Sequence, residues 1–424
     1  MVRLRGKDRH HWSVIGCRPW ITGDGHRDVL LLGQKMKKSI LAVSVLAAFC
    51  GVAHAQSSVT LYGTLDDAIA DFSNVQGANG SGNQIRMSSG NLSPNLWGLK
   101  GKEDLGNGLS AVFKLESGFN VNNGNMGQNG RIFGRTAMVG LSDATAGTVT
   151  LGRQYDPLID LIQPLTDDDN FGSTFATPGD IDNYDNSYRT NNSIKYASPS
   201  YGGFQWSALY GVGGQAGNVS EGQTIAVAAA YNNGPVGFAA GYFRATNNGN
   251  TTNDGSVGTF DQFNSNSVDS PAINGALASA RSLQIIRAAG DYAFGPVTVG
   301  LSYSNVDYTD YLTTVGGGND TKYNTGQFMI NYQATPAALV GFGYNYTKGS
   351  GSDVNAAYNQ FSLGGVYNLS KRTSLYAMAG YQKATGNTTA SGTLAPATAS
   401  FADFGYDAST DSQSMVMVGL RHQF

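Results

Sequence analysis

The clearest structural signal lies in the last nine residues, Val416-Met417-Val418-Gly419-Leu420-Arg421-His422-Gln423-Phe424. In an extended chain, Val416, Val418, Leu420 and Phe424 share one face, and Gly419, Arg421 and Gln423 share the other. A period of two is the signature of a β-strand. Residues 373–382 repeat the pattern, and neither segment has enough large aliphatic side chains for a conventional core. The end of the chain therefore predicts a strand that does not belong to an ordinary globular sheet.

A recurrent unit of tyrosine, tight turn and new strand runs through the second half of the chain. Its clearest copy is Tyr231-Asn232-Asn233-Gly234-Pro235-Val236-Gly237-Phe238. The same layout starts at Tyr292, Tyr332 and Tyr367, with an earlier variant at Tyr196. Gly, Pro and Asn each form turns for a distinct backbone reason. A tyrosine that faces outward before each turn is typical of the aromatic girdle of a membrane barrel.

Longer polar stretches alternate with the tight turns. They are rich in Asn, Gly, Ser, Thr and Asp, and they cover residues 121–130, 156–188, 247–281, 308–322 and 384–411. Short turns at one end of the strands and long loops at the other are the asymmetry of an outer-membrane barrel, with periplasmic turns and extracellular loops.

The segments between turns and loops predict about sixteen antiparallel strands, an even number with both chain ends on the short-turn side. The predicted ranges are 58–72, 92–104, 109–120, 131–142, 148–155, 189–197, 203–212, 223–231, 236–246, 282–293, 296–307, 323–333, 338–347, 358–368, 373–383 and 412–424. In lipid every backbone polar group must be paired, so such a sheet must close. At this size the lumen is too wide for side chains to fill and holds water. The predicted fold is an all-β transmembrane antiparallel barrel around a pore.

The composition excludes other classes of protein. Of 424 residues, 13% are charged and 57 are Gly, and the mean hydropathy is -0.23. The longest apolar run, residues 40–53, is shorter than the roughly 18–20 residues of a membrane-spanning helix, so a helical bundle is excluded. The acidic balance and the lack of a basic cluster predict no nucleic-acid binding.

Two segments precede the predicted barrel. Residues 36–55 combine the basic start Met36-Lys37-Lys38, the apolar run and the site Ala53-His54-Ala55, which predict a secretory signal peptide. We interpret residues 1–35 as an upstream extension from a start codon assigned too early, and residues 56–424 as the mature barrel. Of the 27 basic and 30 acidic residues, 18 and 27 remain in the mature chain, a net charge of -9. Only His422 and no cysteine remain, which excludes thiol catalysis, His-based triads and His-clustered metal sites.

Several stretches spread over residues 56–424 together resemble the general trimeric porins of Gram-negative outer membranes, of the beta-proteobacterial type. These stretches are 58–63, 96–111, 133–141, 147–155 and 418–424. The resemblance implies a homotrimer in the cell outer membrane, exported through the periplasm and surrounded by lipids and lipopolysaccharide. It implies that the barrel-insertion machinery reads a terminal signal at Phe424. It also implies that the third loop, residues 156–188, folds into the lumen and narrows it.

A porin narrows its channel where opposite charges face each other across a water-filled gap. The third loop contains no Lys or Arg, and its candidate acidic residues are Asp160, Asp167, Asp168, Asp169, Asp180, Asp182 and Asp185, with Asp156 at its start. Two alternatives stay open. Residues 167–169 could simply be solvated, and residues 180–185 have oxygen ligands at calcium-like spacing without the Gly and closing Glu of an EF-hand loop.

Strand alternation selects candidates for the charged pore wall. The residues that it directs into the lumen are Arg86, Lys114, Glu116, Arg189 and Lys195. Alternation instead places Arg131 and Arg135 on the outward side with Ala137 and Val139, and Arg153 is equally difficult to assign to the lumen. Since the resemblance implies a wall arginine at positions like Arg131, either a bulge resets the register or these strands lie at a subunit interface. Both arginines are retained as wall candidates.

The predicted function is passive diffusion of ions and small hydrophilic solutes, without catalytic residues, metal or cofactor. One alternative is an outer-membrane barrel enzyme with a hydroxyl nucleophile, for which no general base is evident. A plugged barrel without open-channel activity is another. A secreted β-sandwich or adhesin explains neither Phe424 nor the repeated tyrosines. The net charge favours cations, but charges outside the constriction matter less than those in it, so the sign of the selectivity stays open.

Overall fold

The computed structural model describes residues 58–77, 80–214, 216–218, 220–247, 272–275, 277, 280–311, 319–352, 354–388, 394–402 and 404–424. The predicted upstream extension (1–35) and signal peptide (36–55) lie outside these residues, and so does most of the loop predicted over 247–281.

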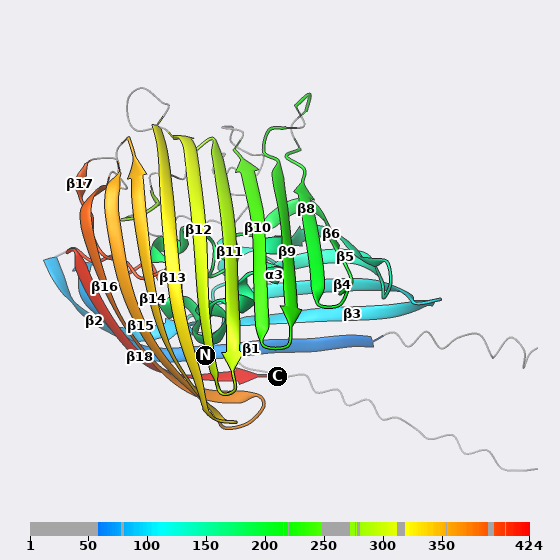
Figure 1. The fold of residues 1–424 in the computed structure, drawn as a ribbon, viewed down its shortest axis with the longest axis horizontal. Helices are drawn as coiled ribbons and strands as arrows, with labels where there is room; N and C mark the ends of the chain where they lie inside the picture. The colour runs from blue at the N-terminus through cyan, green and yellow to red at the C-terminus, as the bar shows by residue number, and fades with distance from the viewer. Residues whose placement is uncertain are drawn as a thin grey trace, which may run out of the picture. The chain divides into compact units, whose positions relative to one another are not determined.

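A single antiparallel sheet contains all the strands of the described residues (Figure 1). These strands are β1 (Ser58–Gly77), β2 (Gly80–Ser89), β3 (Leu96–Gly106), β4 (Leu109–Gly118), β5 (Thr136–Asp143), β6 (Gly147–Gln154), β7 (Thr190–Ala197), β8 (Phe204–Gly211), β9 (Thr224–Asn233), β10 (Val236–Thr246), β11 (Ser282–Phe294), β12 (Val297–Tyr311), β13 (Asn319–Thr335), β14 (Ala338–Gly351), β15 (Asn355–Asn368), β16 (Thr373–Thr388), β17 (Ala395–Pro396) and β18 (Ser412–Gln423).

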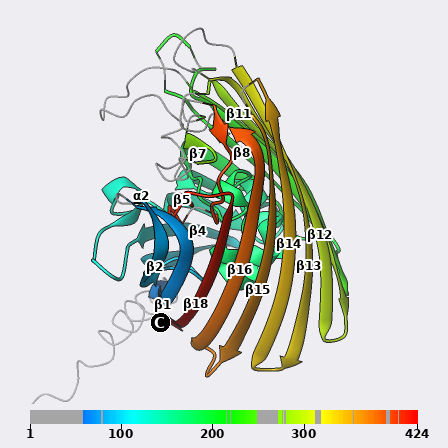
Figure 2. The same cartoon turned by 90° about the vertical axis from the view of Figure 1, so that its left-hand side faces the viewer.

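The sheet closes on itself, because β1 pairs with β18 on one edge and with β2 and β3 on the other (Figure 2). β2 pairs with the second half of β1 and β3 with residues 58–64, so β2 and β3 are two halves of one interrupted strand. β17 is only a two-residue bridge beside β16. The described residues thus form a closed barrel of sixteen strands, which confirms the predicted number and fold.

Four predicted strand boundaries were wrong by five residues or more. Two of them are the ends of β1 and β16, predicted at residues 72 and 383 but observed at Gly77 and Thr388. The second strand was predicted to start at residue 92, but β2 already begins at Gly80 and the strand is interrupted at residues 90–95. The fourth was predicted over 131–142, but β5 begins at Thr136. Positive φ values at Gly130 (73°) and at Asn129 (60°) turn the chain before β5, so extended pairing starts later than the apolar pattern suggests.

The outer face of the barrel carries the predicted apolar band. Val416 and Val418 of β18 are 56% and 61% exposed, as expected for side chains that face lipid. The tyrosines that precede the short turns are also exposed, and they are Tyr231, Tyr292, Tyr332 and Tyr367. They form the aromatic girdle at the periplasmic end.

The wall differs in height around the barrel. β5, β6, β7 and β8 have 8 residues each, whereas β11 to β16 have 13 to 17 (Figure 1). A transmembrane strand needs roughly 9–11 residues, so the short side is not matched to a full bilayer.

The interruption between β2 and β3 bends into the barrel around a buried carboxylate. The carboxylate of Asp66 accepts N–H bonds from Asn91, Leu92 and Ser93 at 3.1, 3.2 and 3.0 Å. It also accepts the hydroxyl of Tyr376 at 2.6 Å. These bonds satisfy backbone groups that the sheet leaves unpaired.

The helices of the described residues are short, and the α-helices among them lie in the second and third loops. α2 (Gly127–Gly130) is in the second loop. The third loop contains α3 (Pro157–Leu161), α4 (Asp167–Phe171) and the 3-10 turns Gln163–Leu165, Gly172–Phe175 and Pro178–Asp180. Within the described part of the chain, no helix is long and apolar enough to cross a membrane.

Candidate functional site

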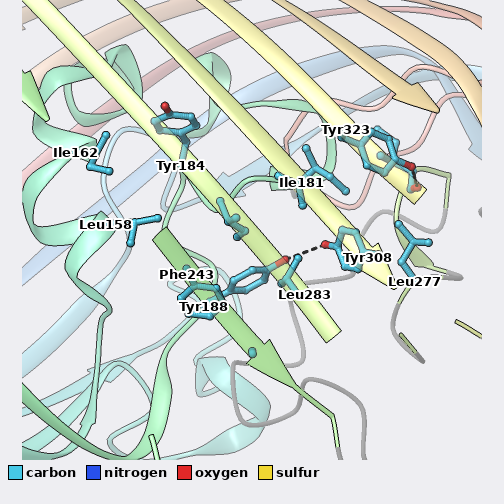
Figure 3. Close-up of a cluster of buried hydrophobic side chains, with 14 of the residues drawn as sticks. Leu158, Ile162, Ile181, Tyr184, Tyr188, Phe243, Leu277, Leu283, Tyr308 and Tyr323 are labelled. Carbon is cyan, nitrogen blue, oxygen red and sulfur yellow. Dashed lines mark hydrogen bonds between the residues drawn. The ribbon is translucent and has the colours of Figure 1, made fainter. Parts of the chain in front are cut away.

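The third loop, residues 155–189, lies inside the barrel and packs along one side of its inner wall. Its apolar side chains Leu158, Ile162 and Ile181 share one buried cluster with Phe243 and Leu283 of the wall (Figure 3). In the same cluster, the hydroxyls of Tyr188 and Tyr308 form a hydrogen bond of 3.2 Å. This packing confirms that the loop folds into the lumen.

Glycines in the wall make room for the centre of the loop. A Cβ at Gly364 would lie 2.4 Å from Cδ1 of Phe171, and one at Gly343 would lie 2.7 Å from Cδ1 of Phe175. The two phenylalanine rings stack with centroids 4.7 Å apart. Beside this contact the loop also meets the interruption between β2 and β3, where the N–H of Ser173 donates to the carbonyl of Asn91 at 3.2 Å. The loop therefore follows the inner wall from β9 and β10, against which α3 packs, to β14, β15 and residues 90–95.

Four of the seven predicted loop carboxylates are buried and hydrogen-bonded within the protein. Asp167 accepts from the side-chain amide of Asn331 at 2.6 Å, and Asp168 accepts from that of Gln163 at 2.8 Å. Asp180 accepts from the Ser187 hydroxyl at 2.6 Å. Asp182 accepts from the hydroxyls of Thr177, at 2.6 Å, and Ser304. These carboxylates fasten the loop to itself and to the wall.

Burial also changes the protonation of these groups. Desolvation raises the pKa of Asp167 and of Asp168 to about 7, because the charged form loses water that its hydrogen bonds replace only in part. Burial likewise raises the pKa of Asp182. Near neutral pH, Asp167 and Asp168 therefore carry less negative charge than a sequence count assigns to them.

The remaining loop carboxylates reach water. Asp160 forms a 2.7 Å ion pair with Lys195 of β7, and its side chain is 40% exposed. Asp169 is exposed. Asp185 is half-buried and lines the main cavity beside the loop.

That cavity has a volume of about 490 Å³ and a basic wall. Arg86 of β2, Arg135 before β5 and Arg189 before β7 line it, and Asp185 lies on the loop side. Polar side chains such as Asn120 complete the lining. The structure therefore brings three predicted wall residues and one predicted loop residue to the same water-filled space.

Each arginine is held in a different way. The guanidinium of Arg86 lies 4.1 Å from the ring centroid of Tyr406, a cation–π contact. Arg189 donates to the hydroxyl of Tyr155 at 2.6 Å and to the carbonyl of Ser187 at 2.9 Å. Within the described residues, no carboxylate pairs with either of these guanidinium groups.

Arg135 belongs to a charge cluster on β4 and β5. Its Nε lies 3.0 Å from Oε1 of Glu116, and Nζ of Lys114 lies 2.9 Å from Oε2 of the same carboxylate. The hydroxyl of Tyr62 donates to Glu116 at 2.9 Å. Two cations and one anion leave a net positive charge, so this cluster adds to the basic wall.

Strand alternation did not direct Arg131, Arg135 and Arg153 into the lumen, and the structure gives a different reason for each. Arg131 lies in the loop before β5 rather than on the barrel wall, and its Nη1 donates to the carbonyl of Gln128 at 3.1 Å. Arg135 immediately precedes the first residue of β5, so alternation does not govern it. The β6–β7 pairing shifts register between Gly152 and Gln154, so Arg153 does not follow the strand alternation. Its Nε donates to the carbonyl of Gly134 at 2.7 Å.

Sequence reasoning missed the aromatic partners Tyr155 and Tyr406. Tyr406 comes from the last loop, and no local pattern connects it with Arg86. The calcium-like set at residues 180–185 does not converge, because Asp180 and Asp182 point to different hydroxyls. The described residues contain no group of three or more His, Cys, Asp or Glu that could hold a metal ion.

A family model described as Gram-negative porin matches residues 42–387. The chain belongs to the Gram-negative porin family. Its barrel is located in the outer membrane and forms a channel for passive diffusion of solutes, as the enclosed cavity and the apolar outer band also indicate.

Relatives support this assignment over nearly the whole length. An outer membrane porin protein of Bordetella pertussis is 33% identical, and the alignment covers 82% of this chain and 94% of that protein. Outer membrane porin protein 32 of Delftia acidovorans is 33% identical over 92% of this chain and 100% of its own length. The structure of an anion-selective porin from Comamonas acidovorans superposes with a TM-score of 0.65 at 25% identity, covering 87% of this chain and 100% of the other.

Proposed function

We propose that this porin conducts anions in preference to cations, and that Arg86, Arg135 and Arg189 form the basic side of its constriction. The observation that carries the proposal is the shared cavity in which three arginines face one loop carboxylate, Asp185. A water-filled pore with low-dielectric walls concentrates counter-ions at such a cluster.

The burial of the third-loop carboxylates supports the same preference. Asp167, Asp168, Asp180 and Asp182 are buried and do not line the cavity. Arg135 and Arg189 are equally buried, at 6% and 3% exposed, but their side chains border it. Among the predicted acidic residues, Asp160, Asp169 and Asp185 are left to act as the acidic side. Asp160 forms an ion pair with Lys195, and this pairing weakens the negative potential that Asp160 presents to passing ions.

A structural relative points in the same direction. The superposed porin from Comamonas acidovorans is named as anion-selective. We extend that preference to this chain because the cavity charge agrees with it. Lys114 and Glu116 then adjust the local field around Arg135 and do not themselves set the sign of selectivity.

We further propose that the channel is a homotrimer and that the side near β1, β2 and β18 faces the neighbouring protomers. On β1, Asp67 and Asp71 project outward beside the exposed apolar Ile69. In the described residues, one carboxylate oxygen of each is buried without a hydrogen-bonding partner. A lipid-facing carboxylate is costly, whereas a protein interface can supply partners. The 8-residue strands β5 and β6 continue this side.

The remaining expectations belong to the same proposal. The chain catalyses no reaction, and Phe424 acts as the signal for the barrel-insertion machinery. Phe424 continues the β18 pairing, since its N–H and carbonyl exchange bonds of 3.0 and 3.1 Å with Gly63.

The test is the zero-current potential of the channel, purified from outer membranes and placed in a planar bilayer under a salt gradient. The potential should have the sign of an anion-selective pore. Arg86→Gln or Arg189→Gln removes one positive charge. For an ion that passes about 7 Å away, this charge is worth about 0.6 kcal/mol in water, favourable to an anion and unfavourable to a cation, so the anion-to-cation permeability ratio should drop about sevenfold. The control is Lys371→Gln, an exposed cation in a periplasmic turn. Cation selectivity of the parent, or equal ratios in all variants, would contradict the proposal.

A further inference from the structure

A small space, which we call the loop–wall cavity, lies between the third loop and the inner wall of the barrel. Its volume is about 20 Å³, which is room for one particle of the size of a water molecule. Leu165, Thr166 and Asp167 line it from the loop, and Gly343 and Asn345 of β14 line it from the wall. None of the described residues lines both this space and the main cavity, so the proposed ion path does not use it.

Two buried oxygen atoms of the lining lack a hydrogen-bonding partner among the described residues. They are Oδ2 of Asp167 and Oδ1 of Asn345, in residues that are 7% and 4% exposed. A Cβ at Gly343 would lie 3.5 Å from Oδ2 of Asp167. Gly343 and Asn345 are successive inward positions of β14, roughly 6.5 Å apart along the strand, so the two oxygens border one small space. Buried polar atoms without partners are rare in proteins, and each needs an explanation.

Hydrogen bonds on the other side of each group fix which atoms face the cavity. Nδ2 of Asn345 donates to the carbonyls of Phe175 and Ala176 at 3.3 and 3.4 Å. Turning this amide round would place its oxygen against two carbonyl oxygens, so Oδ1 must point away from them. Asn331 donates to Oδ1 of Asp167 at 2.6 Å, which leaves Oδ2 for the cavity. Both groups therefore present acceptors to the cavity.

The hydroxyl groups of the lining add oxygen atoms rather than protons. The hydroxyl of Ser302 donates to Oε1 of Gln327 at 2.6 Å. The hydroxyl of Ser362 donates to the carbonyl of Thr174 at 2.7 Å. Each hydroxyl has a single proton, so its lone pairs remain for another partner. Carboxylate, amide and hydroxyl oxygens together are the ligands that hard cations prefer.

The buried charge of Asp167 is not compensated by a positive side chain. Within the described part of the chain, Asp167 forms no ion pair with Lys or Arg. In contrast, the positive charge of Arg287 opposes the rise in the pKa of Asp168 and Asp182. Buried charges in proteins are paired or bind metal ions. A water molecule would satisfy the two oxygens but would leave the charge uncompensated.

We propose that the loop–wall cavity binds one dehydrated monovalent cation, sodium or potassium, with Asp167 and Asn345 as its fixed ligands. The volume has no room for a hydrated ion. One carboxylate neutralises one positive charge, whereas a divalent ion would leave an excess charge buried. The cation joins the third loop to β14 and so stabilises the docked loop. The inference does not rest on the ion preference proposed above.

The test measures docking of the third loop in the purified channel while the cation is varied. Thr174 is fully buried and its carbonyl binds the wall at Ser362, so maleimide labelling of Thr174→Cys reports the undocked loop. Sodium or potassium chloride replaces the chloride of N-methylglucamine, a cation too large for the cavity, at constant ionic strength. A proton competes for the same carboxylate, so the assay is run at about pH 8.5, above the pKa of about 7 to which burial raises Asp167.

We expect the labelling rate to fall as sodium or potassium is added, about tenfold when the cation is at ten times its dissociation constant. Asp167→Asn removes the charge, and its new amide can donate to Asn345, so its labelling rate should not depend on the cation. The matched control is Asp168→Asn, because Asp168 is also buried but does not line the cavity. This variant should keep the cation dependence of the parent.

A second readout does not depend on the folding of any variant. Crystals of the parent soaked in a thallium(I) salt should show an anomalous peak between Asp167 and Asn345. Equal labelling of the parent in all three cations, an unchanged cation dependence in Asp167→Asn, or no anomalous peak at the cavity would each overturn the proposal. Loss of the dependence in Asp168→Asn to the same degree as in Asp167→Asn would also contradict it.

Discussion

The packing of the third loop depends on wall positions that have no side chain. Phe171 is fully buried, and a Cβ at Gly364 would lie 2.4 Å from its ring. Atoms cannot approach so closely, so Gly364→Ala must displace the ring of Phe171. The next residue, Gly365, provides a control on the same strand, because the nearest atom to a Cβ there is the carbonyl oxygen of Ala377 at 3.9 Å.

The expected magnitudes follow from the buried volume. Phe171→Ala removes a fully buried ring and should weaken docking of the loop by about 3–5 kcal/mol. Gly364→Ala adds one methyl group to a filled space and should cost about 1–3 kcal/mol. In the double variant the methyl group occupies space that the ring has left. We therefore expect the double variant to be about 1–3 kcal/mol more stable than the sum of the single changes predicts.

The assay uses a cysteine placed in the loop. Residues 56–424 contain no cysteine, and Thr174 is fully buried three residues after Phe171. In a Thr174→Cys background, the rate of maleimide labelling measures the population of undocked loop. Phe171→Ala should raise this rate by two to three powers of ten or more, roughly tenfold per 1.4 kcal/mol. Gly365→Ala should leave it unchanged.

Whether the effects of the two substitutions add is as informative as the size of each effect. Additive effects of Phe171→Ala and Gly364→Ala would show that the two positions do not share one space. A labelling rate in Gly364→Ala equal to that in Gly365→Ala would refute the reasoning outright, because the close approach of ring and wall would then be absent.

Three further predictions concern pH, the inward turn and the chain end. Burial raises the pKa of Asp167 and Asp168 to about 7, so docking of the loop is most stable below the ordinary aspartate pKa and weakens as pH rises through 7. Because the thiolate is the species that reacts, labelling is expressed relative to an exposed cysteine at the same pH. This relative rate at Thr174→Cys should rise between pH 5 and pH 9, and less so with Asp168→Asn. Asp66→Ala leaves three N–H groups without their acceptor, at about 1–3 kcal/mol each, and should lower the unfolding temperature in detergent, whereas an unchanged temperature would mean that water replaces the carboxylate. Deleting Phe424 removes its two bonds to Gly63 and the proposed insertion signal, so folded trimer in outer membranes should fall while the amount of unfolded chain rises, as measured by heat-dependent gel mobility.

Much of the barrel could be predicted because the residues of its outer face follow a simple alternating pattern in the sequence. Lipid requires apolar side chains at every second position, and turns require Gly, Pro or Asn, so both signals are local in sequence. The inward orientation of Arg86 and Lys195 followed from the same alternation, and the cavity lining and the Asp160 ion pair agree with it. The number of strands followed from counting turns.

The interior could not be predicted in the same way, because its contacts join residues far apart in the chain. Asp167 bonds to Asn331, which is 164 residues away, and no local pattern links them. The interruption at residues 90–95 likewise depends on Asp66 and Tyr376, from two other strands. Local signals also fail at Arg131 and Arg135, since alternation applies only once a strand has begun.

The charge of the whole chain is a poor guide to the charge that a permeating ion meets. The mature chain has nine more acidic than basic residues, which alone would favour cations. Four of those acidic residues are buried within the third loop, where they accept hydrogen bonds, and burial raises the pKa of Asp167, Asp168 and Asp182. The guanidinium groups of Arg86, Arg135 and Arg189 instead border the cavity. Although Arg135 and Arg189 are themselves buried, arginine remains charged in such sites. Folding the loop into the barrel therefore separates the two signs of charge: it withdraws carboxylates from water and leaves cations beside the path, so the selectivity depends on how the loop packs.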